Sequence, residues 1–308
     1  MPRQKYSRTR ERTISDALTR LIQKVTRFQR DLVNTLLDYF LEKFRLKDSK
    51  IEVDPRNFGV VNAVRKIYED WNEPRQREIL KTVVDSLTEL HQNNRDYFNQ
   101  FSDGDITPDS EKVFTDMMKR LGYDRGKGSL TRGGYLETVL QSDDPVLQIK
   151  TEALRAVITG RSIADFKKDL DIIARGNSTT PGILEKHYGA HLYDIFQQYD
   201  REVGKLLAER LGLKFAIYQG GLIKTSRPFC IERNDKIFTA DEISQFGTSK
   251  DKYGGYENKS TGYFQGKPQV YNPFVDLGGY NCRHQLDWVS NEIGELLKAD
   301  QDRANFKA

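Results

Sequence analysis

Long apolar segments are missing from this chain of 308 residues. No apolar run approaches the about 20 residues that a membrane-spanning helix needs. The basic N-terminus also lacks the apolar core and cleavage site of a secretory signal. We therefore expect a protein that is not secreted and has no membrane partner.

Cysteine is scarce as well, because the chain holds only Cys230 and Cys282. Two cysteines without a secretion signal are typical of a reducing compartment, where thiols stay free, buried or metal-bound. Three interpretations of the pair remain open. The thiols bind a metal, form a disulfide, or pack beside each other as small buried groups.

Charge is abundant but uneven. Charged residues make up 31% of the chain and aromatic residues 11%, a content of aromatics that excludes a disordered chain. The net charge is +4, yet residues 1–30 hold nine basic side chains against two acidic ones. Such an arm contacts nucleic acid or an acidic protein surface, or is a solvated terminus without a partner. The candidate contacts are Arg3, Lys5, Arg8, Arg10 and Arg12.

Helical periodicity governs the N-terminal half. Apolar residues recur at helical spacing from Ile14 to Phe40, which predicts one long helix ending near Leu46. At about 1.5 Å per residue this helix is too long for one small domain to cover, so neighbouring helices or a partner protein must cover it. The pattern predicts further helices over 60–71 and 75–101, with a break at 72–74 between them.

Later segments change in character. Helices are expected over 107–121, 144–160, 162–175 and 181–211, followed by a short strand at 215–218 and a last helix at 286–298. The predicted fold is α+β, a long-helix N-terminal region followed by a small mixed domain with short strands and hairpins. We divide the chain into a helical region with its basic arm (1–122), a loop or hinge (123–134) and a C-terminal domain (135–308). That domain comprises helices (135–211), a small β-containing part (212–285) and the last helix (286–298).

Two short motifs are the most informative part of the chain. They read GGLIKTSRPFC, from Gly220 to Cys230, and GGYNCRH, from Gly278 to His284. Each places a cysteine near an arginine and after a glycine pair, and the turn-rich stretch between them suggests that the two ends meet. The residues brought together would be Arg227, Cys230, Cys282, Arg283 and His284.

The order of these elements resembles the phage Mu F-like head-morphogenesis proteins, the minor head proteins of tailed phages. The resemblance runs from about Gly160 to the C-terminus. It implies a minor structural protein of the head, associated with the portal, that acts in capsid assembly and DNA packaging or delivery. The implied partners are the portal protein, other head proteins and packaged DNA. The implied location is the capsid interior or the portal vertex of the virion, and the host cytoplasm during assembly.

The chemistry of the motifs admits other functions. Cys230, Cys282 and His284, with His187 or His191, supply ligands of the kind that zinc prefers, but the spacing is a poor chelate. A cysteine beside a histidine can also act as a nucleophile, although no oxyanion hole is evident. We interpret the motif as structural, with the two arginines locking loops through Asp276, Asp241 or Glu242, and expect neither catalysis nor a cofactor. A DNA-binding internal head protein and a Cys/His-dependent or metal-dependent enzyme are the alternatives.

Overall fold

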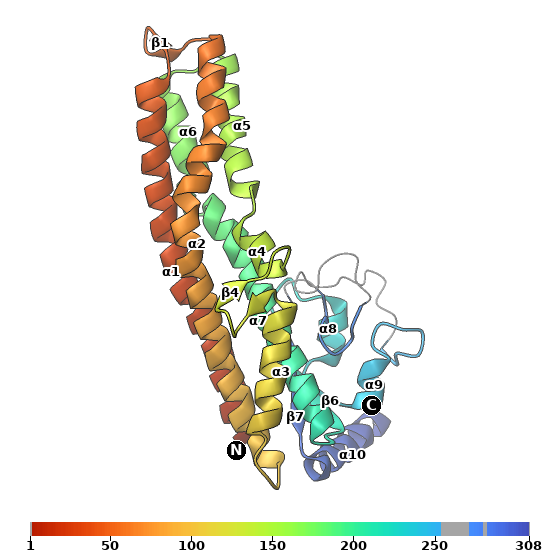
Figure 1. The fold of residues 1–308 in the computed structure, drawn as a ribbon. Coiled ribbons are helices and arrows are strands. Elements are labelled where there is room, and N and C mark those ends of the chain that lie inside the picture. Colours follow the sequence, from red (N-terminus) through yellow and green to blue (C-terminus); the bar gives the residue numbers. More distant parts are fainter. Residues whose placement is uncertain (1, 254–270, 280–281, 308) are drawn as a thin grey trace. The chain divides into compact units, whose positions relative to one another are not determined.

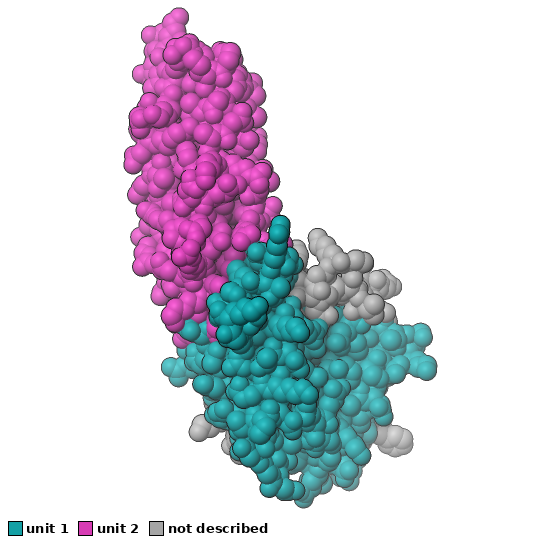
Figure 2. Space-filling view, viewed as in Figure 1, with its two compact units in different colours: residues 1–16, 85–137, 192–308 teal, residues 17–84, 138–191 magenta. Residues whose placement is uncertain are grey.

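The computed structural model describes the backbone of residues 2–253, 271–279 and 282–307. The chain forms two compact units that interleave in sequence (Figure 2). We call residues 17–84 and 138–191 the helical unit, and residues 1–16, 85–137 and 192–308 the sheet unit. Three long helices contribute residues to both units: α1 (Pro2–Lys43), α2 (Pro55–Phe98) and α7 (Ile183–Arg210).

The helical unit packs parts of α1, α2 and α7 with α5 (Asp144–Ile158) and α6 (Ile163–Arg175). Its core contains an aromatic group in which the Phe166 ring contacts the rings of Phe40 and Phe44 edge-on. Gln29 of α1 joins two helix ends, because its Oε1 accepts hydrogen bonds from the backbone N–H groups of Leu184 and Glu185, at 3.0 and 3.2 Å. Its amide group donates to the Arg175 carbonyl at 3.3 Å, so one buried side chain holds the end of α6 beside the start of α7.

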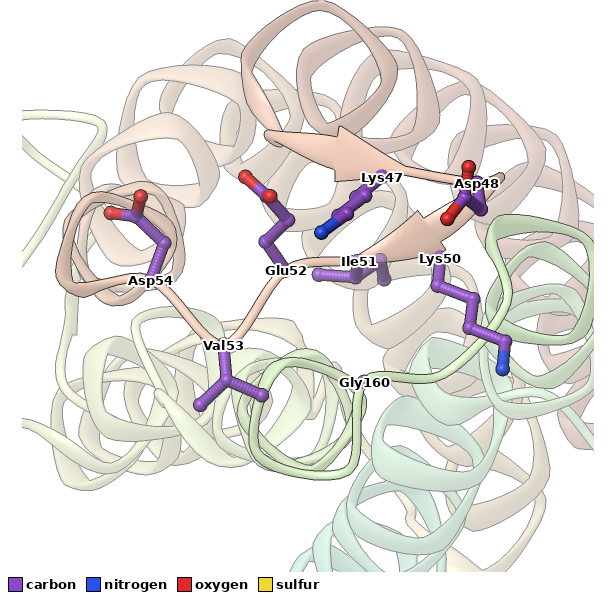
Figure 3. A pocket seen from close by; sticks show the side chains of 8 residues that line it. All are labelled: Lys47, Asp48, Lys50, Ile51, Glu52, Val53, Asp54 and Gly160. Carbon is purple, nitrogen blue, oxygen red and sulfur yellow. The ribbon is translucent and has the colours of Figure 1, made fainter.

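A small hairpin, β1 (Leu46–Lys47) and β2 (Lys50–Ile51), connects α1 to α2. Asp48 and Ser49 form its turn with φ of 51° and 61°, the left-handed values that a two-residue type I′ turn requires at both positions. The hairpin and Gly160 line a hollow of about 440 Å³ (Figure 3). Its acidic and basic side chains point in different directions, so they do not converge on one ligand position.

The sheet unit is built on a three-stranded antiparallel sheet with the order β6-β5-β7 (Figure 1). Its strands are β5 (Phe215–Gln219), β6 (Lys236–Thr239) and β7 (Gln285–Val289). Phe215 and Ile217 of β5 face α10 (Asn291–Lys307) and pack with Leu297. The strand alternation turns Tyr218 to the opposite face, where it lies near α8 (Pro228–Arg233).

Smaller elements complete the sheet unit. They are η1 (Asn99–Phe101), α3 (Thr107–Arg120), β3 (Tyr123–Asp124), β4 (Ser129–Leu130) and α9 (Ala240–Ser244), while α4 (Tyr135–Leu140) spans the boundary between the units. The predicted α+β fold is confirmed, and 66% of the chain is helical. The units do not follow the linear division expected at 123–134, because that segment is the β3–β4 hairpin of the sheet unit. No helix in the described ranges combines the length and apolar character needed to cross a membrane.

Of the two expected ways of covering the apolar stripe from Ile14 to Phe40, neighbouring parts of this chain are sufficient, because its members are buried, with Leu18 half-buried. Two expectations about the elements are wrong. The break expected at 72–74 is absent, and α2 continues through Pro74. Residues 285–289 form strand β7, and the last helix begins only at Asn291.

Candidate functional site

The two motifs meet at one buried site in the sheet unit. Cys230 lies on α8, which begins with Pro228 at its first position, while Cys282 and His284 lie just before β7. The Cys230 and Cys282 sulfurs are 3.8 Å apart, and the Cys282 sulfur is 3.9 Å from Nδ1 of His284. The three residues are only 3%, 2% and 3% exposed. The predicted meeting of the two cysteines with His284 is therefore confirmed.

Tyr218 of β5 completes the group, although the sequence did not point to it. Its hydroxyl lies 3.3 Å from the Cys230 sulfur and 3.9 Å from the Cys282 sulfur. Its ring stacks on the imidazole of His284, with centroids 4.9 Å apart. Burial raises the pKa of Tyr218 well above its ordinary value, so the hydroxyl stays protonated. It donates a hydrogen bond to the Cys230 sulfur. The signal available in the sequence was its place at the end of a strand that leads into Gly220.

Glycines allow the backbone to approach this closely. A Cβ placed on Gly278 would lie 2.5 Å from the Cys230 sulfur and 3.1 Å from the Cys282 sulfur. A Cβ placed on Gly220 would lie 2.4 Å from the Cα of His284. The distances of 2.5 and 2.4 Å are shorter than real Cβ contacts, so the first glycine of each pair is required for steric reasons.

The two thiols are coupled electrostatically. The hydrogen bond with Cys230 lowers the pKa of the Cys282 thiol well below its ordinary value, and His284 and Arg201 lower it further. The bond with Cys282 raises the pKa of Cys230, and burial adds to that rise. Both cysteines are free, since a disulfide requires sulfurs about 2.05 Å apart.

Arg201 of α7 holds the loops around the site in place. We had expected this role for Arg227 and Arg283. Its buried guanidinium donates to the carbonyls of Val275, Cys282 and His284, at 2.9, 2.5 and 3.0 Å. By contrast, Arg283 is exposed, and Arg227 precedes the first turn of α8.

The acidic residues proposed as arginine partners have other contacts. Asp276 accepts from the backbone of Asn272, and Glu242 binds Lys298 while capping α9 through Thr239. Asp241 lies in the first turn of α9. A second buried arginine, Arg233, pairs with Asp251 and stacks over the Phe229 ring.

His187 and His191 are not part of the cysteine site. They belong to the helical unit, where Nε2 of His187 lies 2.9 Å from the Val139 carbonyl and the two imidazole rings are 4.9 Å apart. Burial lowers the pKa of His191 to about 4, and His187 contributes to this shift. Both rings are therefore neutral near pH 7.

The basic arm divides into two groups. Arg10 is buried in the sheet unit, where it forms ion pairs with Asp200 and Asp287 at 3.4 and 2.6 Å. It is not available to a phosphate, so its assignment as a nucleic-acid contact is wrong. Arg12 is exposed beside Asp16. Arg3, Lys5 and Arg8 belong to α1, but their side chains lie outside the described part of the chain.

The helical unit carries an exposed apolar stripe. On α5, Leu147, Leu154 and Ile158 are 54%, 36% and 57% exposed, and their spacing of seven and four residues places them on one helix face. Val53, which is 65% exposed, projects toward the turn at Gly160 that follows α5 (Figure 3). We call Val53, Leu147, Leu154 and Ile158 the α5 stripe.

Comparison with known proteins gives no match: none of the family models, curated proteins or solved structures searched resembles this chain significantly.

Proposed function

We propose that this chain is a minor head protein of a tailed phage that binds the portal and acts in assembly of the head and in packaging or delivery of DNA. The observation that carries the proposal is the convergence of the two motif segments. They are separated by about 50 residues, and they form one buried site through Tyr218, Cys230, Cys282 and His284. The motifs on which the family resemblance rests therefore act as a unit.

The nature of that site supports a structural role. A nucleophilic thiolate must reach a substrate, whereas both sulfurs here are buried and turned toward each other and toward Tyr218. Arg201 uses its guanidinium to bind three backbone carbonyls. The side chains of the site therefore connect segments of the sheet unit that are distant in sequence.

The α5 stripe provides the surface for a partner. Exposed leucines and isoleucines aligned on one helix face are a common feature of protein interfaces. We assign the portal protein to this surface, since the stripe from Ile14 to Phe40 is covered within the chain. Two of the five proposed DNA contacts no longer favour the DNA-binding alternative, because Arg10 is buried and Arg12 lies beside Asp16.

Affinity purification of the tagged full chain from phage-producing cells tests the proposal. We expect the phage portal protein to co-purify with it, and to stay bound when nuclease removes DNA. Recovery of host proteins or DNA without the portal protein would contradict the proposed function.

A further inference from the structure

Four polar side-chain atoms in the sheet unit surround one point. They are the sulfurs of Cys230 and Cys282, Nδ1 of His284 and the hydroxyl of Tyr218. The four recorded distances between them are 3.3, 3.8, 3.9 and 3.9 Å. The two sulfurs and the histidine nitrogen lie within 4.8 Å of one another.

These separations are close to the edges of a small tetrahedron. With metal–sulfur bonds of about 2.3 Å and metal–nitrogen or metal–oxygen bonds of about 2.0–2.2 Å, the edges of a tetrahedral zinc site measure about 3.3–3.8 Å. The distance of 3.8 Å between the two sulfurs matches such a site, while the 3.9 Å from the Cys282 sulfur to Nδ1 of His284 exceeds a sulfur–nitrogen edge by about 0.3 Å. The sulfurs are therefore already placed for coordination, and binding requires the imidazole, which lies within 4.8 Å of both, to move toward them.

Plain packing explains the arrangement less well. A thiol pair in an apolar core would be surrounded by aliphatic groups, whereas here an imidazole nitrogen and a hydroxyl face the sulfurs. Burial of so many polar atoms is costly unless a ligand compensates for it.

We propose that Cys230, Cys282 and His284 bind one divalent metal ion of the zinc class, with Tyr218 at the fourth corner. Two soft thiolates with one imidazole favour zinc over magnesium or calcium, which prefer oxygen ligands. The ion joins α8, the segment before β7 and the end of β5. It is a structural site, because its protein groups fill all four corners and the ligands are buried. This inference does not depend on the proposed function.

Metal content of the full chain gives the first test. We expect one equivalent of zinc per chain in protein purified without chelators. Replacement by Co²⁺ should give the visible bands of a tetrahedral ion and the near-ultraviolet absorption of a thiolate ligand. Reduced wild-type protein that contains no zinc and gives no such cobalt spectrum would overturn the proposal. So would a Cys230–Cys282 disulfide found by mass spectrometry in protein made in a reducing cytoplasm.

Variants separate the ligands from neighbouring residues. Cys282→Ser and His284→Gln should each lose the bound metal, while the matched control His191→Gln keeps it, because that histidine lies in the helical unit. Tyr218→Phe should keep the ion but change the cobalt bands, since a fourth ligand is exchanged. Full zinc retention in Cys282→Ser would overturn the assignment.

A loss of metal in a variant that fails to fold would be ambiguous, so the wild-type protein supplies a second measurement. Chelation should lower its melting temperature, and added Zn²⁺ should restore it, because an ion that binds only the folded state stabilises that state. A melting temperature unaffected by both treatments contradicts a structural metal.

Discussion

Three arginines, Arg10, Arg201 and Arg233, are buried in the described part of the sheet unit, and the first two bind groups that are remote in sequence. Arg201 donates to three carbonyls of the segment 275–284, and Arg10 lies between the carboxylates of Asp200 and Asp287. A buried cation is retained only where such partners compensate for its lost hydration. These two side chains therefore determine the stability of the unit more than the exposed arginines do.

Replacement of Arg201 should strongly destabilise the protein. Arg201→Ala leaves three buried carbonyls without their donor, and at about 1–3 kcal/mol for each unsatisfied group we expect a loss of at least about 3 kcal/mol in the free energy of unfolding. Urea denaturation of both proteins measures the difference. The matched control is the exposed Arg283→Ala, which should change stability by less than about 0.5 kcal/mol. Equal losses in the free energy of unfolding of the two variants would contradict the role assigned to Arg201.

Replacement of Arg10 should have a pH-dependent effect. Burial raises the pKa of Asp200, and Arg10 opposes that rise. A carboxyl with a raised pKa in the folded protein favours folding most at low pH, and this contribution declines as the pH rises through the folded pKa. Arg10→Met raises the pKa further, so it should cost about 3 kcal/mol near neutral pH.

The cost of this change should be clearly smaller near pH 4 than near neutral pH, because protonation of Asp200, whose pKa is raised, removes the buried charge that Arg10 compensates. Unfolding curves at the two pH values test the expectation. The exposed Arg12→Met serves as the control. A cost for Arg10→Met that is the same at both pH values would mean that the charge of Asp200 does not matter.

At the scale of elements, periodicity and capping residues predicted most helices correctly. Ser162 caps α6 by accepting from the Asp165 N–H at 3.1 Å, and Gly176 ends that helix with φ of 75°. The errors arose where tertiary contacts outweighed local signals. Residues 285–289 form a strand because they pair with β5, and Ser290, which precedes the first residue of α10, was the overlooked sign of a later helix start.

The continuation of α2 through Pro74 has a similar cause. Trp71 is buried and donates its indole N–H to Asp31, and Arg75 donates to the Trp71 carbonyl at 2.5 Å. These contacts offset a cost of about 3 kcal/mol for an internal proline. Such contacts within the helical unit join segments about 40 residues apart, which no local pattern reveals.

Replacement of this proline should stabilise the protein. Pro74 is exposed, so Pro74→Ala restores a backbone N–H that can donate to the Asp70 carbonyl without disturbing the core. We expect the free energy of unfolding to rise by about 1–3 kcal/mol. Thermal and urea unfolding measure the change against Glu73→Ala, an exposed neighbour. A destabilised Pro74→Ala protein would show that α2 depends on the backbone geometry that Pro74 imposes.

The α5 stripe yields a prediction about binding. Leu147→Glu, Leu154→Glu and Ile158→Glu together place charges on an exposed apolar face, so stability should change little while portal binding falls at least about tenfold. The matched control is Ile293→Glu with Leu296→Glu, which alters exposed apolar residues of α10 in the sheet unit. Portal affinity measured by pull-down or calorimetry compares the two. Equal binding by both variants would place the interface elsewhere.

On the scale of the whole chain, each compact unit draws on distant parts of the sequence. The sheet unit uses residues 1–16, 85–137 and 192–308, which explains why a linear division near 123–134 did not describe it. The glycine pairs and the motif order predict that Cys230, Cys282 and His284 lie together. Arg201 could not be predicted, because a single residue in a helix carries no such signal, and the one signal for Tyr218 was its place at the end of a strand that leads into Gly220.

The central claim is that this chain is a component of phage heads. Quantitative mass spectrometry of purified proheads and mature heads tests it most directly. Our account predicts that the chain is present in proheads in low copy number, at a fixed ratio to the portal protein, and that the ratio falls when the α5 stripe is replaced by glutamates. Absence of the chain from both proheads and mature heads, in cells that express it at a normal level, would contradict the account.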